Sequence, residues 1–260
     1  MKILIIGDVV ARPGRTAVLE RIEDLREQHN IDLAIMNAEN TSGGFSITPQ
    51  HAEELFRAGI DVMTSGNHIF DKREIVPYIA RQRRLLRPAN YPAGTPGSGI
   101  WTGDVRGTSV AVINLIGRVF MSPVDDPFRA VDQLIDALDA GVKVRLVDIH
   151  AEATSEKCAL AWYLDGRVSA VTGTHTHVQT ADERILPNGT AFLTDIGMTG
   201  SYAGVIGMKR EDVIARFTSV VHRRAEHATG TVRICAVVIN VDDETGRARE
   251  ITRLSLPHEQ

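Results

Sequence analysis

Two histidines separated by a single threonine, His175 and His177, follow a short apolar stretch with the sequence RVSAVTG. Neutral imidazole is the commonest metal ligand among protein side chains, so a close pair on a polar turn is a candidate metal site. A single histidine beside an apolar core is more often a hydrogen-bonded structural residue. The interpretation therefore depends on whether other predicted strands also end on side chains that can bind a metal.

Four other apolar stretches of the chain end in the same way. They carry Asp8 in IIGDVV, Glu39 and Asn40 in IMNAEN, Asn67 and His68 in TSGNH, and His150 in LVDIH. Each stretch is typical of a buried β-strand, and in open α/β sheets ligands bind beyond the carboxyl ends of the strands. Taken singly, Asp8 and Asn40 fit an ordinary turn or loop. The repetition of strand and ligand instead predicts one shared site at one edge of a sheet.

The set of donors indicates which ions would fit. Carboxylate and amide oxygens with three or four imidazoles exceed what a single four-coordinate zinc ion requires. They suit two adjacent divalent ions bridged by one carboxylate, with Fe or Mn favoured and Zn or Mg as the alternatives. Paired ions about 3.5–4 Å apart are a standard means of phosphoester hydrolysis. Cys158 and Cys235 lie in apolar segments outside this set, which argues against a thiolate or iron–sulfur site.

Strand-like and helix-like patterns alternate along the chain and predict one α/β domain over residues 1–260. The predicted strands are 2–7, 32–40, 60–68, 108–117, 142–150, 167–177, 189–197, 230–242 and 246–256, the last two as an antiparallel pair. The predicted helices are 15–30, 48–59, 71–82, 126–141 and 154–166. Residues 87–103 are rich in Pro and Gly and predict a long loop. Whether its central part, Pro92–Gly99, closes over a substrate is left open.

Composition narrows the class of protein. The 260 residues are 43% hydrophobic and 24% charged, as in an ordinary globular domain. The formal net charge of −4 disfavours a dedicated duplex-binding surface, which usually carries a basic stripe. The N-terminal MKILIIGDVV lacks the features of a signal peptide, and no stretch reaches the roughly 18 apolar residues of a membrane span. These features predict a cytoplasmic enzyme or binding protein without a membrane partner.

In chain order, GDVV, NAEN, GNH, DIH and GTHTH resemble the motif blocks of the calcineurin-like metallophosphoesterases. In that superfamily the blocks are GDxH, GDxxD, GNH, a lone histidine and GHxH. Two departures narrow the resemblance: Val10 stands where the superfamily has a metal-binding histidine, and NAEN replaces GDxxD. Together with ARPGR near the start and LTDIGMTG later in the chain, they resemble the YmdB branch of bacterial phosphodiesterases.

The resemblance implies a fold and a set of roles. The implied fold is an αββα sandwich, two mixed β-sheets flanked by helices, with a dinuclear metal site at the C-terminal ends of the strands. The implied ligands are Asp8, Glu39, Asn40 and His177 for one ion, and Glu39, Asn67, His150 and His175 for the other. Glu39 would bridge the two ions, and Asn40 would replace the histidine that is missing at Val10. His68 would be the general acid that protonates the leaving alcohol.

The resemblance also implies phosphodiesterase activity on cyclic nucleotides, with 2′,3′-cyclic forms favoured over 3′,5′-cyclic forms. One alternative is a phosphomonoesterase or 5′-nucleotidase with the same metal centre. Another is a non-catalytic regulator that binds a cyclic nucleotide or an RNA end, although a binding protein needs no proton donor. The negative charge disfavours broad contact with an RNA backbone. Assembly into a homo-oligomer is left open.

Five further polar residues near the motifs have no assigned role. Asp71 could orient His68, but DKRE has the form of a helix capping box, which is the favoured interpretation. Asp148 and Asp195 are candidate partners of the ligand histidines. Arg12 and Arg15 could contact a phosphate, and surface ion pairs explain them equally well.

Overall fold

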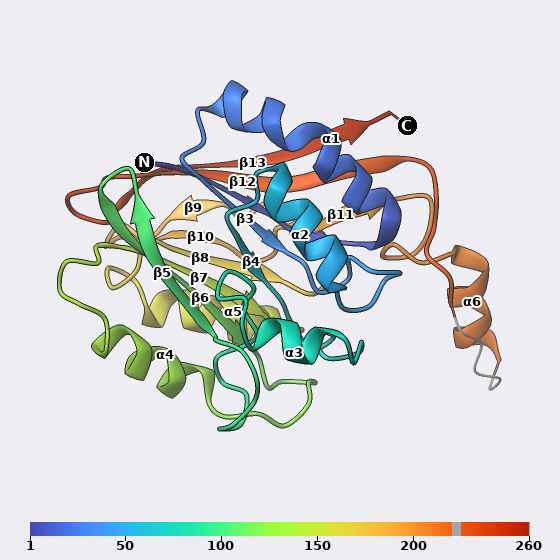
Figure 1. The fold of residues 1–260 in the computed structure, drawn as a ribbon, viewed down its shortest axis with the longest axis horizontal. Coiled ribbons are helices and arrows are strands. Elements are labelled where there is room, and N and C mark those ends of the chain that lie inside the picture. Colours follow the sequence, from blue (N-terminus) through green and yellow to red (C-terminus); the bar gives the residue numbers. More distant parts are fainter. Residues whose placement is uncertain (220–224, 260) are drawn as a thin grey trace.

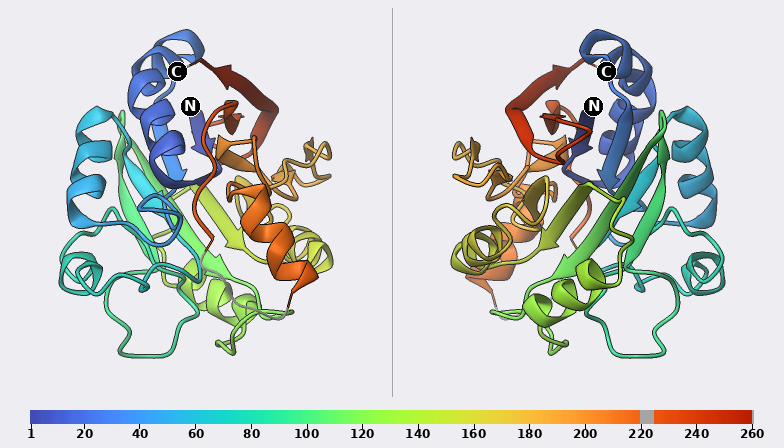
Figure 2. Two further views of the ribbon diagram at one scale, coloured as in Figure 1. Left: turned by 90° about the vertical axis from the view of Figure 1, so that its right-hand side faces the viewer. Right: turned by 90° about the vertical axis from the view of Figure 1, so that its left-hand side faces the viewer.

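Two mixed β-sheets pack face to face and carry helices on both outer faces (Figure 1). The structure is a computed structural model and describes residues 1–219 and 225–259. Figure 2 shows the sheets edge on, with α1 and α2 covering one sheet and α4 and α5 the other. This layering confirms the predicted αββα sandwich.

The first sheet is built mainly from the two ends of the chain. Its strands are β1 (Lys2–Ile6), β2 (Asp8–Val9), β3 (Leu33–Asn37), β4 (Val62–Thr64), β11 (Met198–Ser201), β12 (Val232–Val241) and β13 (Ala248–His258). Their order is β2-β11-β12-β1-β3-β4, with β13 paired to β12 off this path. Strands β1, β3 and β4 are parallel, whereas β12 is antiparallel to β1 and to β13, which confirms the predicted C-terminal pair.

The second sheet comes from the middle of the chain. Its strands are β5 (Ile100–Val105), β6 (Thr108–Ile116), β7 (Val144–His150), β8 (Ala170–Thr174), β9 (Arg184–Ile185) and β10 (Ala191–Leu193), in the order β5-β6-β7-β8-β10-β9. Strands β6, β7, β8 and β10 are parallel neighbours. The carboxyl ends of the parallel strands in each sheet therefore deliver their following residues to one edge.

Successive side chains of each strand point to opposite faces of its sheet, so the core is divided into layers. Ile3 and Ile5 of β1 pack between the sheets against residues such as Val112 and Leu146. Leu4 and Ile6 point the other way and pack beneath α1. Because both faces of β1 are covered, its sequence KILII is apolar after the first residue.

Two of the helices in the described part of the chain begin at a capping side chain. The helices are α1 (Ala11–His29), α2 (Pro49–Ala58), α3 (Ile75–Ile79), α4 (Pro127–Asp136), α5 (Thr154–Tyr163) and α6 (Arg210–Thr218). Thr48 caps α2 by accepting the N–H of His51, and Asp126 caps α4 by accepting the N–H of Phe128. None of the helices in the described residues has the length and apolar character needed to cross a bilayer.

The structure corrects several predicted boundaries. The helix predicted over 71–82 is reduced to α3, its N-cap is Glu74, and Asp71 caps nothing, so the capping-box interpretation was wrong. Strand β5 begins inside the predicted loop 87–103, and α6, β2, β9 and β11 were not predicted. The strands among them are short or polar and exist because a partner strand pairs with them. Figure 1 shows α6 at one end of the molecule, away from both sheets.

Candidate metal centre

Side chains from both sheets meet at the edge where the parallel strands end. The Nε2 atom of His150, the last residue of β7, lies 3.0 Å from Glu39 Oε1 and 3.1 Å from Asn67 Oδ1. It also lies 3.0 Å from Nδ1 of His175. Donor atoms this close together are typical of ligands sharing one ion, because metal–ligand bonds are about 2.0–2.2 Å long. Glu39, His150 and His175 form a group whose donor atoms all lie within 4.8 Å of one another.

Asp8, Asn40 and His177 extend this group on its other side. Nε2 of His177 lies 4.0 Å from Asp8 Oδ1. Oδ1 of Asp8 and Oδ1 of Asn40 are buried and have no hydrogen-bond partner in the part of the chain that the structure describes. A buried oxygen without a partner is destabilising unless a cation or donor approaches it. The residues present therefore fit a bound cation here, and all seven predicted ligands are brought together.

Each of the three candidate ligand histidines has one ring nitrogen engaged away from the centre. His150 Nδ1 donates to Thr174 Oγ1 (3.0 Å), His175 Nε2 lies 3.1 Å from Glu152 Oε2, and His177 Nδ1 donates to the carbonyl of Ile206 (3.0 Å). Such partners set the tautomer and leave the other nitrogen, which faces the centre, free to bind a metal. Sequence reasoning missed Thr174, Glu152 and Ile206, and only Glu152 carries a signal, because it follows the ligand His150 by two residues.

Asp148 supports the centre from beneath. The Thr174 hydroxyl that accepts from His150 donates in turn to Asp148 Oδ1 over 2.9 Å. The Thr64 hydroxyl donates to the other carboxylate oxygen. Burial raises the pKa of Asp148 to about 6, although the hydroxyl of Thr64 and the charge of His150 oppose the rise. Asp148 thus lies one hydroxyl away from the candidate ligand His150 and orients it.

The electrostatics of the metal-free centre favour cation binding. Burial opposes ionisation of Glu39, but the charge and hydrogen bond of His150 outweigh it and hold the pKa of Glu39 at about 2. Burial likewise lowers the pKa of His150, but Glu39 and Asp8 raise it to about 9. Burial and the neighbouring charge of His150 lower the pKa of His175 to about 3, so this imidazole is neutral. A cation would replace the proton that His150 holds.

His68 lies beside the ligands. Its backbone N–H donates to Glu39 Oε2 (3.1 Å), and its Nδ1 donates to Asp71 Oδ2 (2.7 Å). The ring lies edge-on to Phe45 at a centroid distance of 5.1 Å. Nε2 has no hydrogen-bond partner among the residues described. Asp71 is therefore the residue that orients His68.

A hollow of about 210 Å³ opens above the centre. Its lining includes His68, His175 and His177. Phe45, Ile206 and Met208 provide an apolar wall. The Pro92–Gly99 loop does not line this hollow. The hollow gives access to the candidate ligands from outside.

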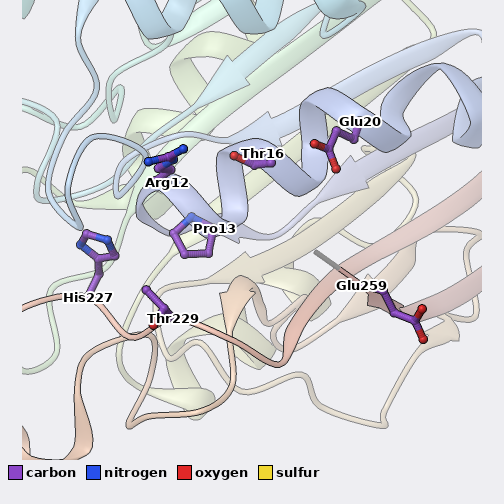
Figure 3. Close-up of a pocket in the computed structure, with 7 residues that line it drawn as sticks. All are labelled: Arg12, Pro13, Thr16, Glu20, His227, Thr229 and Glu259. Atoms are coloured by element: carbon purple, nitrogen blue, oxygen red, sulfur yellow. The ribbon is translucent and has the colours of Figure 1, made fainter.

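A larger hollow of about 510 Å³ lies between α1 and a segment that includes His227 and Thr229 (Figure 3). Its lining includes Arg12 but none of the candidate ligands. Arg15 lies nearby, donates to the carbonyl of Thr41 (3.0 Å), and lines neither hollow. Donor chemistry, rather than the size of a hollow, therefore marks the candidate metal centre.

A buried ion pair holds the turn that carries the two histidines of the opening motif. Lys157 on α5 is fully buried, and its Nζ donates to Asp195 Oδ2 over 2.7 Å. The same oxygen accepts from the backbone N–H (3.2 Å) and the hydroxyl (2.7 Å) of Thr176. Thr176 separates His175 and His177, whose φ angles of 101° and 64° are uncommon for residues other than glycine. The pair therefore stabilises a strained turn that presents both imidazoles.

Replacing Lys157 with methionine is expected to lower the free energy of unfolding of the metal-free protein by about 3–5 kcal/mol, because Asp195 is left as a buried, unpaired charge. The measurement is urea unfolding of chelator-treated protein followed by circular dichroism. Arg167→Met is the control, since it removes the partly exposed pair between Arg167 and Asp132 and should change stability by less than about 1 kcal/mol. An equally small effect for Lys157→Met would contradict the role of the pair.

Comparison with known proteins identifies the family to which the chain belongs. The model of the family described as YmdB-like protein matches residues 4–254. The chain is 49% identical over 254 residues to the 2′,3′-cyclic-nucleotide 2′-phosphodiesterase of Bacillus subtilis (strain 168), covering 98% of this chain and 96% of that protein.

Solved structures agree with this match. The crystal structure of a hypothetical protein from Thermus thermophilus is similar over 100% of both chains, with a TM-score of 0.94 and 42% identity. That of a novel phosphatase from Mycoplasma pneumoniae has a TM-score of 0.94 and 31% identity, covering 99% of this chain and 93% of the other. With its two-sheet sandwich and its cluster of donors at the strand ends, the chain belongs to the YmdB-like family of the calcineurin-like metallophosphoesterase superfamily.

Proposed function

We propose that the protein is a dinuclear metal-dependent phosphodiesterase that hydrolyses cyclic nucleotides, with 2′,3′-cyclic nucleotides as the favoured substrates. One observation carries the proposal: His68, which is not one of the donors, lies beside a buried donor group, since its N–H donates to Glu39, and Asp8 and Asn40 of that group have unpaired oxygens. The unpaired oxygens support cation binding, and the position of His68 supports proton transfer next to the bound cation. The name of the Bacillus subtilis relative supports the choice of substrate.

Two divalent cations are the proposed cofactors, with Fe or Mn favoured. One would be held by Asp8, Glu39, Asn40 and His177, and the other by Glu39, Asn67, His150 and His175. When bound, such ions polarise phosphoryl oxygens and lower the pKa of water. The fully buried Glu39 carboxylate, with its low pKa, remains negative at neutral pH and offsets part of their charge.

His68 is the proposed proton donor. In the protonated ring, Asp71 holds the Nδ1–H, and Nε2–H is the proton that can be transferred. Water forms a new bond to phosphorus and releases one proton to solvent. As the bond between phosphorus and the ribose 2′-oxygen breaks, the His68 proton passes to that oxygen, leaving a nucleoside 3′-phosphate and a neutral imidazole. The apolar side chains of Phe45, Ile206 and Met208 offer a surface for the base.

The experiment is an assay of chelator-treated protein reloaded with Mn²⁺ or Fe²⁺. Each form is given 2′,3′-cyclic AMP, 3′,5′-cyclic AMP and 5′-AMP, and products are separated by chromatography. We expect turnover only after reloading, with 2′,3′-cyclic AMP converted fastest and 3′-AMP as its product. Faster turnover of 5′-AMP would instead identify a 5′-nucleotidase. Binding of 2′,3′-cyclic AMP without turnover by protein containing two ions would identify a regulatory binding protein.

A further inference from the structure

The 510 Å³ hollow beside α1 carries charged side chains of opposite sign at its two ends. Arg12 and His227 lie at one end, whereas Glu20 and Glu259 lie at the other (Figure 3). Its volume falls within the range of about 300–1,000 Å³ that is typical of small-molecule sites. No part of the proposed reaction uses this hollow.

This hollow adjoins the one above the metal centre. Val10 and Met208 line the catalytic hollow, and Arg12 lies only two residues beyond Val10. Two residues span at most about 7 Å of chain. On the other side, His227 forms a β-bridge with Met208. Neighbouring residues of the same two short segments therefore line the two hollows.

The chemistry of 2′,3′-cyclic phosphates makes such a molecule relevant. They form in RNA when a ribose 2′-hydroxyl attacks the adjacent phosphorus. A new bond from phosphorus to the 2′-oxygen forms, and the bond to the 5′-oxygen of the next nucleotide breaks, with the proton passing to that oxygen. The upstream product is an RNA strand whose last nucleotide carries the cyclic phosphate. Unless every linkage is cut, that nucleotide remains attached to another phosphate on its 5′ side.

We infer that the hollow beside α1 binds this 5′ phosphate through Arg12. The substrate class of the site then includes short oligoribonucleotides that end in a 2′,3′-cyclic phosphate. This inference rests on the proposed function, because it places the cyclic phosphate at the metal centre. In addition to the cyclic phosphate, the protein would recognise the phosphate on the 5′ side of the same nucleotide.

The charged side chains around the hollow explain why it would bind one phosphate and repel a second. Arg12 is exposed and has no carboxylate partner in the portion of the chain that is described. Guanidinium groups bind phosphate through two parallel hydrogen bonds. The hydroxyls of Thr16 and Thr229 also line this hollow. Glu20, 3.0 Å from His258 Nε2, and Glu259 would repel a further phosphate, so recognition ends after one.

The test compares a substrate that reaches the hollow with one that does not. The substrates are the dinucleotide ApA ending in a 2′,3′-cyclic phosphate and 2′,3′-cyclic AMP. We expect the wild-type protein to have a kcat/KM about tenfold higher for the dinucleotide, as one charge-assisted contact allows. Arg12→Gln should abolish this preference. Arg21→Gln is the matched control, on the same helix but outside the hollow, and should keep it.

Salt provides a second measurement. The ratio of kcat/KM for the dinucleotide to kcat/KM for 2′,3′-cyclic AMP should fall as salt is added. A plot of the logarithm of this ratio against the logarithm of salt concentration should have a slope of about −0.7, as expected when one phosphate of a single strand is neutralised. Equal kcat/KM values for the two substrates in wild type, or a preference that survives Arg12→Gln, would overturn the inference while leaving the proposed function standing.

Binding of reaction products separates failure of the inference from failure of the proposed function. ApA with a 3′-phosphate and 3′-AMP are titrated into each protein by calorimetry. A preference for the dinucleotide that depends on Arg12 supports the upstream contact, even if neither cyclic substrate is hydrolysed. Equal binding of the two, with no dependence on Arg12, overturns it.

Discussion

Replacing Glu39 with glutamine is expected to lower kcat/KM for phosphodiester hydrolysis by on the order of 10³-fold or more. The carboxylate is buried and lies 3.0 Å from His150 Nε2. Its low pKa keeps it negative at neutral pH, so glutamine removes a full charge from the position proposed to bridge both ions. Metal content, measured by atomic emission after reloading, should fall from two ions per chain to one or none.

Glu54→Gln is the matched control for Glu39→Gln. Glu54 lies on α2, its side chain is 46% exposed, and its ion-pair partner is Arg15, at 3.9 Å. Its replacement should leave metal content and activity unchanged. Retention of both ions and of normal turnover by Glu39→Gln would rule out the bridging role. Circular dichroism of the metal-free proteins shows whether any loss arises from unfolding.

Replacing His68 with glutamine is expected to lower kcat for 2′,3′-cyclic AMP by about 10²–10⁴-fold while metal content is retained. The ring is not a proposed ligand, so its loss removes the proton donor and leaves the donor set intact. The effect should depend on the leaving group. A ribose oxygen needs a proton as it departs, whereas p-nitrophenolate departs without one. Hydrolysis of bis(p-nitrophenyl) phosphate should therefore fall much less than that of the cyclic nucleotide.

Two further variants complete the test of His68. Asp71→Asn keeps the size of the side chain that receives the His68 Nδ1–H but removes its charge, and should lower kcat by about tenfold, less than His68→Gln. His29→Gln, at the C-terminal end of α1, is the control and should have no effect. An equal loss on both substrates for His68→Gln would mean that His68 positions the substrate or the ions instead of donating a proton.

The sequence predicted the candidate site well because of a local regularity. Each parallel strand is covered on both faces and is therefore a continuous apolar run, and the residue after it changes abruptly to a donor. This pattern, together with the family resemblance, predicted seven candidate ligands and His68, and the structure brings these residues close together. It worked because the carboxyl ends of parallel strands lie at one edge, whichever order the strands take in the sheet.

The same reasoning failed for groups whose roles depend on distant partners. Lys157 resembles a solvated lysine on an amphipathic helix, yet it is fully buried and paired with Asp195. Asp71 has the spacing of a helix cap, but the helix begins later, and His68 takes the carboxylate instead. For Asp71 the local pattern favoured the wrong interpretation, and for Lys157 it carried no prediction, because in both cases the partner is set by packing.

The sequence by itself thus determined the types of donor and their order along the chain, because these follow from motifs over a few residues, and its resemblance to a known superfamily implied the αββα class. Only the tertiary structure decided which ring nitrogen of each histidine faces the centre, since Thr174, Glu152 and the carbonyl of Ile206 occupy the others. It also decided that β2 pairs with β11 and that two hollows adjoin across Val10 and Met208. These features join segments far apart in the chain, and no local pattern records such a pairing.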